Sequence, residues 1–295
     1  MQNNIKKLNF VFFGTPDVAS GTLEILKQAG FLPSLIVTSP DARSGRKMLI
    51  TPPPVKVWAI ENNIPYIQPE KLDEEFCNQL KPSCLEPNCL FIVVAYGKIM
   101  PKNVLEMPRL GSINIHYSLL PKYRGASPVE SAILNGDRET GITIQQMEYK
   151  MDSGAIIAQE KVEILPEEKA PELRKRLIKI GGEFLVKTLS TSSALQQVQG
   201  TSPYVGGGWV GVKQDESKAT YCVKIKKEDG LVNIETDSDE TLWRKFRAYS
   251  HWPRTFFFKD DKRIIITDAE LVDNKFVIKK ILPEGKKEID YKNTN

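Results

Sequence analysis

The chain has 295 residues, of which 41% are hydrophobic and 26% charged, a composition typical of a folded soluble protein. Its 41 basic residues barely outnumber its 37 acidic ones, so the net charge of +4 permits an anionic partner without requiring one. The excess divides as +2 before Trp209 and +2 from Trp209 onward, so neither part is a basic tail. At this length, two domains are favoured over one.

Neither a metal site nor a membrane segment is expected. The four cysteines form no C-x-x-C pair and have no neighbouring histidine, so we expect reduced, mostly buried thiols: Cys77, Cys84, Cys89 and Cys222. The N-terminal apolar run is too short for a signal peptide, and the apolar stretch 90–95 is far shorter than the ~20 residues that span a bilayer. We therefore predict a cytoplasmic protein without a bound metal.

The first half of the chain alternates strands and helices. Residues 8–13 read as a buried strand, 14–17 as a tight turn and 18–29 as a helix closed by Gly30. Further elements follow at 35–38 (strand), 54–62 (helix) and 90–95 (a strand apolar on both faces). This order predicts an α/β protein with a Rossmann-like, doubly wound, mostly parallel sheet.

The second half predicts two more strands, a helix and a separate β domain. Residues 141–147 and 156–164 alternate like strands on either side of the turn 152–154, and 170–189 has helical apolar spacing. The Ser-, Thr-, Gln- and Gly-rich stretch 190–208 has a linker composition, so we expect a catalytic domain at 1–189 and a second domain at 209–295. In the latter, a helix begun by Asp239 as N-cap and five strands predict an OB-like barrel; the strands are 220–225, 231–234, 255–258, 264–267 and 276–281.

One segment carries candidate acyl-transfer chemistry. Asn114 and His116 end the strand-like run 112–116, and Asp152 lies in the turn that follows the next strand. An amide can stabilise an oxyanion, an imidazole can shuttle a proton near neutral pH, and a carboxylate can orient that imidazole or take the proton itself. From spacing alone, a structural histidine at a strand end remains the alternative.

Three further features allow more than one interpretation. The turn Gly14-Thr15-Pro16 could approach an anion, but it lacks the G-x-G-x-x-G pattern, which disfavours a nicotinamide dehydrogenase. The long basic loop 41–54 could hold a phosphate backbone or be a solvated surface loop. His251 has no nearby carboxylate or second histidine, which favours packing or hydrogen bonding over catalysis.

Ordered motifs along nearly the whole chain resemble the formyltransferase superfamily, and within it the enzymes that formylate methionyl-tRNA. The resemblance is carried by residues 13–17, 52–57, 93–97, 105–108, 111–128, 140–141, 151–154, 214–221, 247–249 and 252–253. It implies the formyltransferase fold followed by an OB-like tRNA-binding barrel. It also implies that formyl passes from 10-formyltetrahydrofolate, without a metal, to the α-amine of methionine on initiator tRNA.

The resemblance also implies roles for individual residues. Asn114, His116 and Asp152 match the superfamily's catalytic residues. The folate is expected to contact Ser118, Leu119, Leu120, Pro121 and the backbone of Val94, Ala95, Tyr96 and Gly97. The loop that carries Arg43, Arg46 and Lys47 resembles the segment that wedges against the tRNA acceptor end. We expect the enzyme to act as a monomer.

The chain departs from the family pattern at several positions. Tyr117 stands where a small residue is usual, which predicts a more crowded site floor, and Ser250-His251 replaces Asn-Pro before Trp252-Pro253. Two alternatives stay open: a formyltransferase acting on an amino-sugar nucleotide, and a folate- or RNA-binding protein without turnover. The complete Asn, His and Asp set argues against the second alternative, because a binding module needs no proton shuttle.

Overall fold

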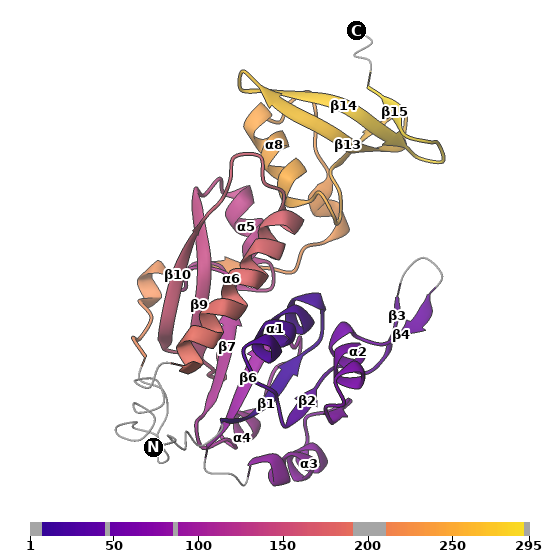
Figure 1. Ribbon diagram of the computed structural model, residues 1–295. Helices are drawn as coiled ribbons and strands as arrows, with labels where there is room; N and C mark the ends of the chain where they lie inside the picture. The colour runs from indigo at the N-terminus through magenta and orange to yellow at the C-terminus, as the bar shows by residue number, and fades with distance from the viewer. Residues whose placement is uncertain (1–7, 45–47, 85–87, 191–210, 292–295) are drawn as a thin grey trace.

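The computed structural model describes residues 8–44, 48–84, 88–190 and 211–291. Figure 1 shows a sheet flanked by helices and, beyond it, a second sheet with one helix against it. The helices are α1 (Asp17–Gln28), α2 (Pro54–Glu61), α3 (Glu74–Cys84), α4 (Lys102–Leu105), α5 (Pro128–Leu134), α6 (Ala170–Ser190) and α8 (Asp239–Ala248), with 3-10 helices at Glu216–Lys218 and Lys227–Gly230. None of these helices combines the length and the apolar character that a membrane span requires.

The first sheet has seven strands in the order β10-β9-β7-β6-β1-β2-β5. They are β1 (Asn9–Gly14), β2 (Leu35–Val37), β5 (Tyr66–Ile67), β6 (Cys89–Val94), β7 (Ser112–His116), β9 (Glu139–Gln146) and β10 (Ile156–Glu163). The strands from β7 to β5 are parallel, whereas β9 and β10 are antiparallel. The prediction of a mostly parallel sheet is therefore confirmed.

Both faces of this sheet are buried, as the apolar strands predict. Phe10 and Phe12 of β1 join one core with α1, α2 and α6, while Val11 and Phe13 join a second core with α3 and α4. The side chains divide in this way because successive residues of a strand point to opposite faces. The fold is thus doubly wound, with helices on both sides (Figure 1).

The C-terminal region is an antiparallel β domain. Its strands β12 (Phe256–Lys259), β13 (Lys262–Val272), β14 (Lys275–Pro283) and β15 (Ile289–Asp290) pair in chain order, and α8 packs its apolar side against them. The helix N-cap is Ser238, which accepts a hydrogen bond from Thr241 N, and not Asp239 as predicted. Asp239 instead accepts from Phe276 N at 2.8 Å, so it joins the helix to the sheet.

Two of the predicted C-terminal strands differ from the structure. The stretch 220–225 contributes only β11 (Tyr221–Cys222), which pairs with β8 (Arg124–Gly125) of the first domain. The stretch 231–234 makes a single bridge, between Leu231 and Phe256. Val212 also pairs with the first domain, through Ile156. The chain therefore returns to the first domain before it enters the second sheet.

The basic loop is more regular than its composition predicts. Its described part forms a hairpin of β3 (Ala42–Ser44) and β4 (Leu49–Thr51), because antiparallel pairing satisfies the backbone groups of these residues. The hairpin projects beside α2 (Figure 1). It begins just beyond β2, whose carboxyl end lies at the same sheet edge as those of β1, β6 and β7.

Candidate active site

Strand β7 carries two of the candidate catalytic residues on one face. Asn114 and His116 alternate with Ile113 and Ile115, whose side chains are buried in the core beneath α1 and α6. This alternation aims the amide and the imidazole away from that core, at the carboxyl edge of the sheet. Open α/β sheets bind their ligands at this edge.

The imidazole of His116 is buried and oriented by two contacts. Its Nε2 lies 2.8 Å from the carbonyl oxygen of Tyr123, and since a carbonyl only accepts, Nε2 carries the proton. Its Nδ1 lies 3.6 Å from Oδ2 of Asp152. The residue is 6% exposed, so few other orientations are available. In the neutral ring, Nδ1 is therefore the nitrogen with a lone pair, and it faces the carboxylate.

Asp152 is held at both carboxylate oxygens. Oδ2 accepts from Gly125 N at 2.8 Å, and Oδ1 accepts from Gln145 Nε2 at 2.9 Å. Gln145 is the register partner of Asn114 on β9, so it lies beside the amide as well. Gln145 was not predicted from the sequence; its position on the alternating strand β9, close to the Asp152 turn, was the usable signal.

A second set of contacts comes from the segment that precedes β11. Gln214 Nε2 donates to the carbonyl oxygens of Asp152 and Gly154 at 2.8 and 2.7 Å, while its Oε1 accepts from Arg124 Nε and Nη2 at 3.1 and 2.7 Å. Arg124 is fully buried and also pairs with Glu216. The guanidinium of Arg124, together with Lys150, lowers the pKa of Glu216 to about 2, and Glu216 in turn raises the pKa of Arg124. Gln214, itself held by Arg124, therefore fixes the backbone of the Asp152 turn.

The turn Ser118–Pro121 lies directly beyond β7 and is fixed by β9 and β10. Thr143 Oγ1 donates to Ser118 O at 2.7 Å and accepts from Leu120 N at 3.1 Å. Gln159 Nε2 donates to Leu120 O at 2.8 Å. The side chains of Thr143 and Gln159 therefore hold the backbone of this predicted folate segment beside His116.

The loop Val94 to Gly97 lies at the end of β6, next to β7. Tyr96 points inward, with its ring 5.5 Å from that of Phe13, whereas Ala95 and Gly97 are exposed. Burial raises the pKa of the Tyr96 hydroxyl to about 12. Gly97 has φ +81°, and nothing lies within 4 Å of where a Cβ would be. The loop thus presents backbone, rather than the tyrosine side chain, at this edge.

Other predicted residues lie elsewhere. Tyr117 packs into the core near Gly181 of α6, so the expected crowding of the site floor is wrong: the residue after His116 points to the opposite face. Arg43 is exposed on the β3–β4 hairpin, and Arg46 and Lys47 lie outside the described residues. His251 is exposed in the C-terminal domain, so it does not pack in the core; the alternative, a hydrogen-bonding role, stays a prediction.

Family comparisons agree with this geometry. Residues 6–189 match the Formyl transferase family, and residues 224–289 match the Formyl transferase C-terminal domain. The chain is 38% identical over 267 residues to the methionyl-tRNA formyltransferase of Caldicellulosiruptor saccharolyticus, covering 90% of this chain and 80% of that protein. It is 36% identical over 267 residues to the enzyme of that name from Moorella thermoacetica, covering 90% and 81%.

Solved structures share the fold at low sequence identity. A methionyl-tRNA formyltransferase from Clostridium thermocellum aligns with a TM-score of 0.59 at 15% identity, covering 96% of this chain and all (100%) of that one. An N-formyltransferase from Helicobacter canadensis, solved with folinic acid and dTDP-3-aminofucose, aligns with a TM-score of 0.62 at 17% identity, covering 91% and 94%. By its match over both domains and its curated relatives, this chain belongs to the formyl transferase family.

Proposed function

We propose that this protein transfers the formyl group of 10-formyltetrahydrofolate to the α-amine of methionine on initiator tRNA, for translation initiation. The observation that carries the proposal is the constellation of Asn114, His116 and Asp152 at the carboxyl edge of the sheet, in a chain whose curated relatives are methionyl-tRNA formyltransferases. The reaction forms a bond between the amine nitrogen and the formyl carbon and breaks the bond from that carbon to folate N10. The amine loses one proton and N10 gains one, so no redox partner is needed.

The catalytic roles follow from the positions of the atoms. His116 Nδ1 accepts the proton of the attacking amine, because Nε2 already carries a proton and donates it to Tyr123 O. Asp152 stabilises the resulting imidazolium from 3.6 Å. Asn114 donates an amide N–H to the oxyanion that develops on the formyl oxygen. The same imidazolium then returns the proton to the departing nitrogen.

The residues around this constellation fit a folate donor. Exposed backbone at Ala95 and Gly97, with open space where a Gly97 side chain would be, can accept hydrogen bonds from a flat heterocycle, or donate them, at close range. The fixed turn of Ser118, Leu119, Leu120 and Pro121 supports the opposite side, and Val94 and Tyr96 complete the loop. Bound there, the folate supplies the formyl group and its leaving nitrogen. Within the described residues, no three His, Cys, Asp or Glu side chains gather as metal ligands, and each step above needs only protein groups.

The tRNA contacts are proposed from charge and placement. Arg43, with Arg46 and Lys47 beyond the described residues, would bind the acceptor end through the hairpin next to the sheet edge. The C-terminal domain would add phosphate contacts independent of sequence, whose strength falls with salt. We further propose that the enzyme is a cytoplasmic monomer.

We propose domain boundaries that differ slightly from those expected from composition. The expected division is 1–189, a linker at 190–208, and 209–295. Because Val212 and β11 pair with the first domain, we assign residues 211–222 to the catalytic unit and begin the C-terminal domain near residue 224.

A second candidate function is formyl transfer to an amino-sugar nucleotide. Solved sugar N-formyltransferases share the fold over about nine-tenths of the chain, which supports a common site for the donor. The curated relatives, at 36–38% identity against 17–18% for these structures, favour the tRNA substrate.

The test is formyl transfer from 10-formyltetrahydrofolate to methionyl initiator tRNA. Elongator methionyl-tRNA and a dTDP-amino sugar serve as competing acceptors. We expect initiator-selective transfer, reduced about 100- to 10,000-fold in His116→Ala. Thermal unfolding of the variant checks that it is folded. Transfer to the amino sugar alone would replace this proposal with the second candidate, and an active His116→Ala would refute the proton-transfer role.

A further inference from the structure

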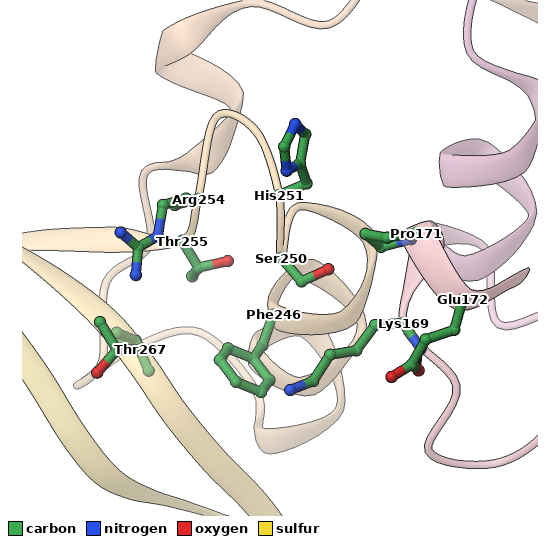
Figure 2. Close-up of a pocket in the computed structure, with 10 residues that line it drawn as sticks. Lys169, Pro171, Glu172, Phe246, Ser250, His251, Arg254, Thr255 and Thr267 are labelled. Atoms are coloured by element: carbon green, nitrogen blue, oxygen red, sulfur yellow. Dashed lines mark hydrogen bonds between the residues drawn. The ribbon is translucent and has the colours of Figure 1, made fainter. Parts of the chain in front are cut away.

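A pocket lies at the junction of the two domains, away from the formyl-transfer site. Its volume is about 230 Å³, and Lys169, Pro171 and Glu172 at the start of α6 form one wall (Figure 2). The opposite walls come from Phe246 of α8, from Thr267 of β13 and from the segment that joins α8 to β12, with Ser250, Arg254 and Thr255. The pocket is therefore built from both family domains.

Three hydroxyl groups at this pocket have no hydrogen-bond partner. The hydroxyl oxygens of Ser250, Thr255 and Thr267 are buried and unpaired, and Thr255 as a residue is 1% exposed. In Figure 2 the Thr255 hydroxyl points towards Ser250. A buried hydroxyl without a partner costs free energy, so such a cluster indicates a ligand that accepts hydrogen bonds.

The charges around the hydroxyls favour an anion. Lys169 Nζ lies 5.0 Å from the centre of the Phe246 ring, and Arg254 and the exposed His251 also line the pocket. The one carboxylate, Glu172, already accepts from Lys169 N at 2.8 Å, a helix-capping contact that partly offsets its charge. Cationic groups beside unpaired hydroxyl donors are the groups that bind phosphate oxygens.

The pocket is held open by contacts between its two walls. Arg247 of α8 is 8% exposed and donates from Nε to Glu168 O and from Nη2 to Leu165 O, both at 3.0 Å. These bonds fix α8 against the segment that leads into α6. Arg254 has φ +69°, a conformation that a non-glycine residue adopts at a cost, and its N–H donates to Tyr249 O at 3.0 Å. These contacts fix the two walls of the pocket relative to each other.

We propose that this pocket binds a phosphate group of the RNA backbone. Ser250 and Thr255 donate their hydroxyls to it, and Lys169 and Arg254 neutralise its charge. The inference rests on the proposed function, because it identifies one point at which the tRNA substrate is held. Both domains contribute to the pocket, so a phosphate there would fix the RNA relative to the catalytic edge as well as to the second sheet.

The binding test uses the full chain with uncharged initiator tRNA. Dissociation constants are measured across several salt concentrations for wild type, Thr255→Val, Thr255→Ser and Arg254→Gln. We expect about tenfold weaker binding for Thr255→Val, recovery in Thr255→Ser, and a shallower salt dependence, by about one unit of slope, for Arg254→Gln. Lys262→Gln, which removes one exposed charge from the same domain, should change affinity less than Arg254→Gln does.

Thermal unfolding separates a ligand role from a structural one. Because the Thr255 hydroxyl has no partner, Thr255→Val should be as stable as wild type or more stable. Stable variants that bind RNA with wild-type affinity and salt slope would overturn the proposal, as would an equal loss of affinity in Lys262→Gln. A less stable Thr255→Val would also count against it, by assigning the hydroxyl a structural partner.

Inorganic phosphate distinguishes the source of the phosphate group. Its binding to the same variants is followed by ³¹P line broadening, and we expect weaker broadening with Arg254→Gln than with wild type. If phosphate binding is lost in the variants while RNA affinity is unchanged, the pocket serves a free anion and the RNA proposal fails. Formyl transfer by the wild type is scored separately, so failure of the pocket and failure of the proposed function give different results.

Discussion

Gln214 Nε2 donates a hydrogen bond to the carbonyl oxygen of Asp152 at 2.8 Å, although 62 residues separate the two in the sequence. The glutamine lies between the two segments that match the family's domains, and it reaches the turn that carries the candidate carboxylate. Its carbonyl side binds Arg124, whose chain neighbour Gly125 donates to the same Asp152 carboxylate. A segment that lies outside the first family domain therefore completes the contacts around Asp152.

Asn114→Ala should reduce the rate of formyl transfer about 100- to 1,000-fold, because one oxyanion donor is lost. The residue is only partly buried, so we expect little change in the free energy of unfolding. Single-turnover transfer to initiator methionyl-tRNA measures the chemical step directly. A rate within a few-fold of wild type would exclude Asn114 as the donor.

Gln145→Met should lower kcat about tenfold or more and leave the KM for the folate donor nearly unchanged. The substitution keeps the volume but removes the N–H that holds Asp152 Oδ1 at 2.9 Å, so the carboxylate is less well fixed. Gln145→Glu is the matched variant: it keeps the shape but places a second carboxylate beside Asp152, and it should shift the pH profile of kcat. A Gln145→Met enzyme with unchanged kcat would show that Gly125 alone positions the carboxylate.

Gly125→Ala should destabilise the protein by about 2–4 kcal/mol. Gly125 has φ +120°, and a Cβ there would lie 2.1 Å from the carbonyl oxygen of Cys222. Gly285→Ala is the control: φ is +71° but nothing lies within 4 Å, so only the backbone cost of about 1 kcal/mol is expected. Urea unfolding of both variants gives the comparison. If both variants lost the same free energy of unfolding, β11 would have to shift to make room for the added Cβ at position 125 with no energetic penalty.

Glu216→Gln should make the free energy of unfolding less dependent on pH below about 4.5. Arg124 and Lys150 lower the pKa of Glu216 from 4.5 to about 2. The stabilisation is therefore complete above pH 4.5 and is lost as the pH falls towards 2. The variant should be less stable than wild type at pH 7, with a difference that shrinks through this window and is reduced by salt screening.

The control for that titration is Glu139→Gln. Glu139 pairs with Lys161 at 2.8 Å, but both side chains are more than half exposed, so its loss should change stability little at any pH. If the free energy of unfolding fell equally with pH for Glu216→Gln and wild type between pH 5 and 2, the result would contradict the coupling of Glu216 to Arg124.

The sequence predicted the elements whose signal is local. The bounds of β7 were predicted without error, and those of β1, α1, β6 and α6 within one residue at each end, because apolar periodicity and turn residues mark them directly. The C-terminal strands were predicted less well. The stretch 220–225 has strand-like residues, but its partner β8 lies nearly a hundred positions earlier in the chain, and no local pattern encodes such a pairing.

The sequence by itself determined the strand face that presents Asn114 and His116, since a period of two fixes which residues share a face. Only the tertiary structure decided which nitrogen of His116 faces Asp152, because that depends on the Tyr123 carbonyl oxygen seven residues away. It also decided that Gln145 and Gln214 hold the carboxylate turn, and that unpaired hydroxyls of the C-terminal domain gather at a pocket lined by both domains. Hydrogen bonds between distant segments depend on distances of about 3 Å that exist only after the sheet and helices have packed.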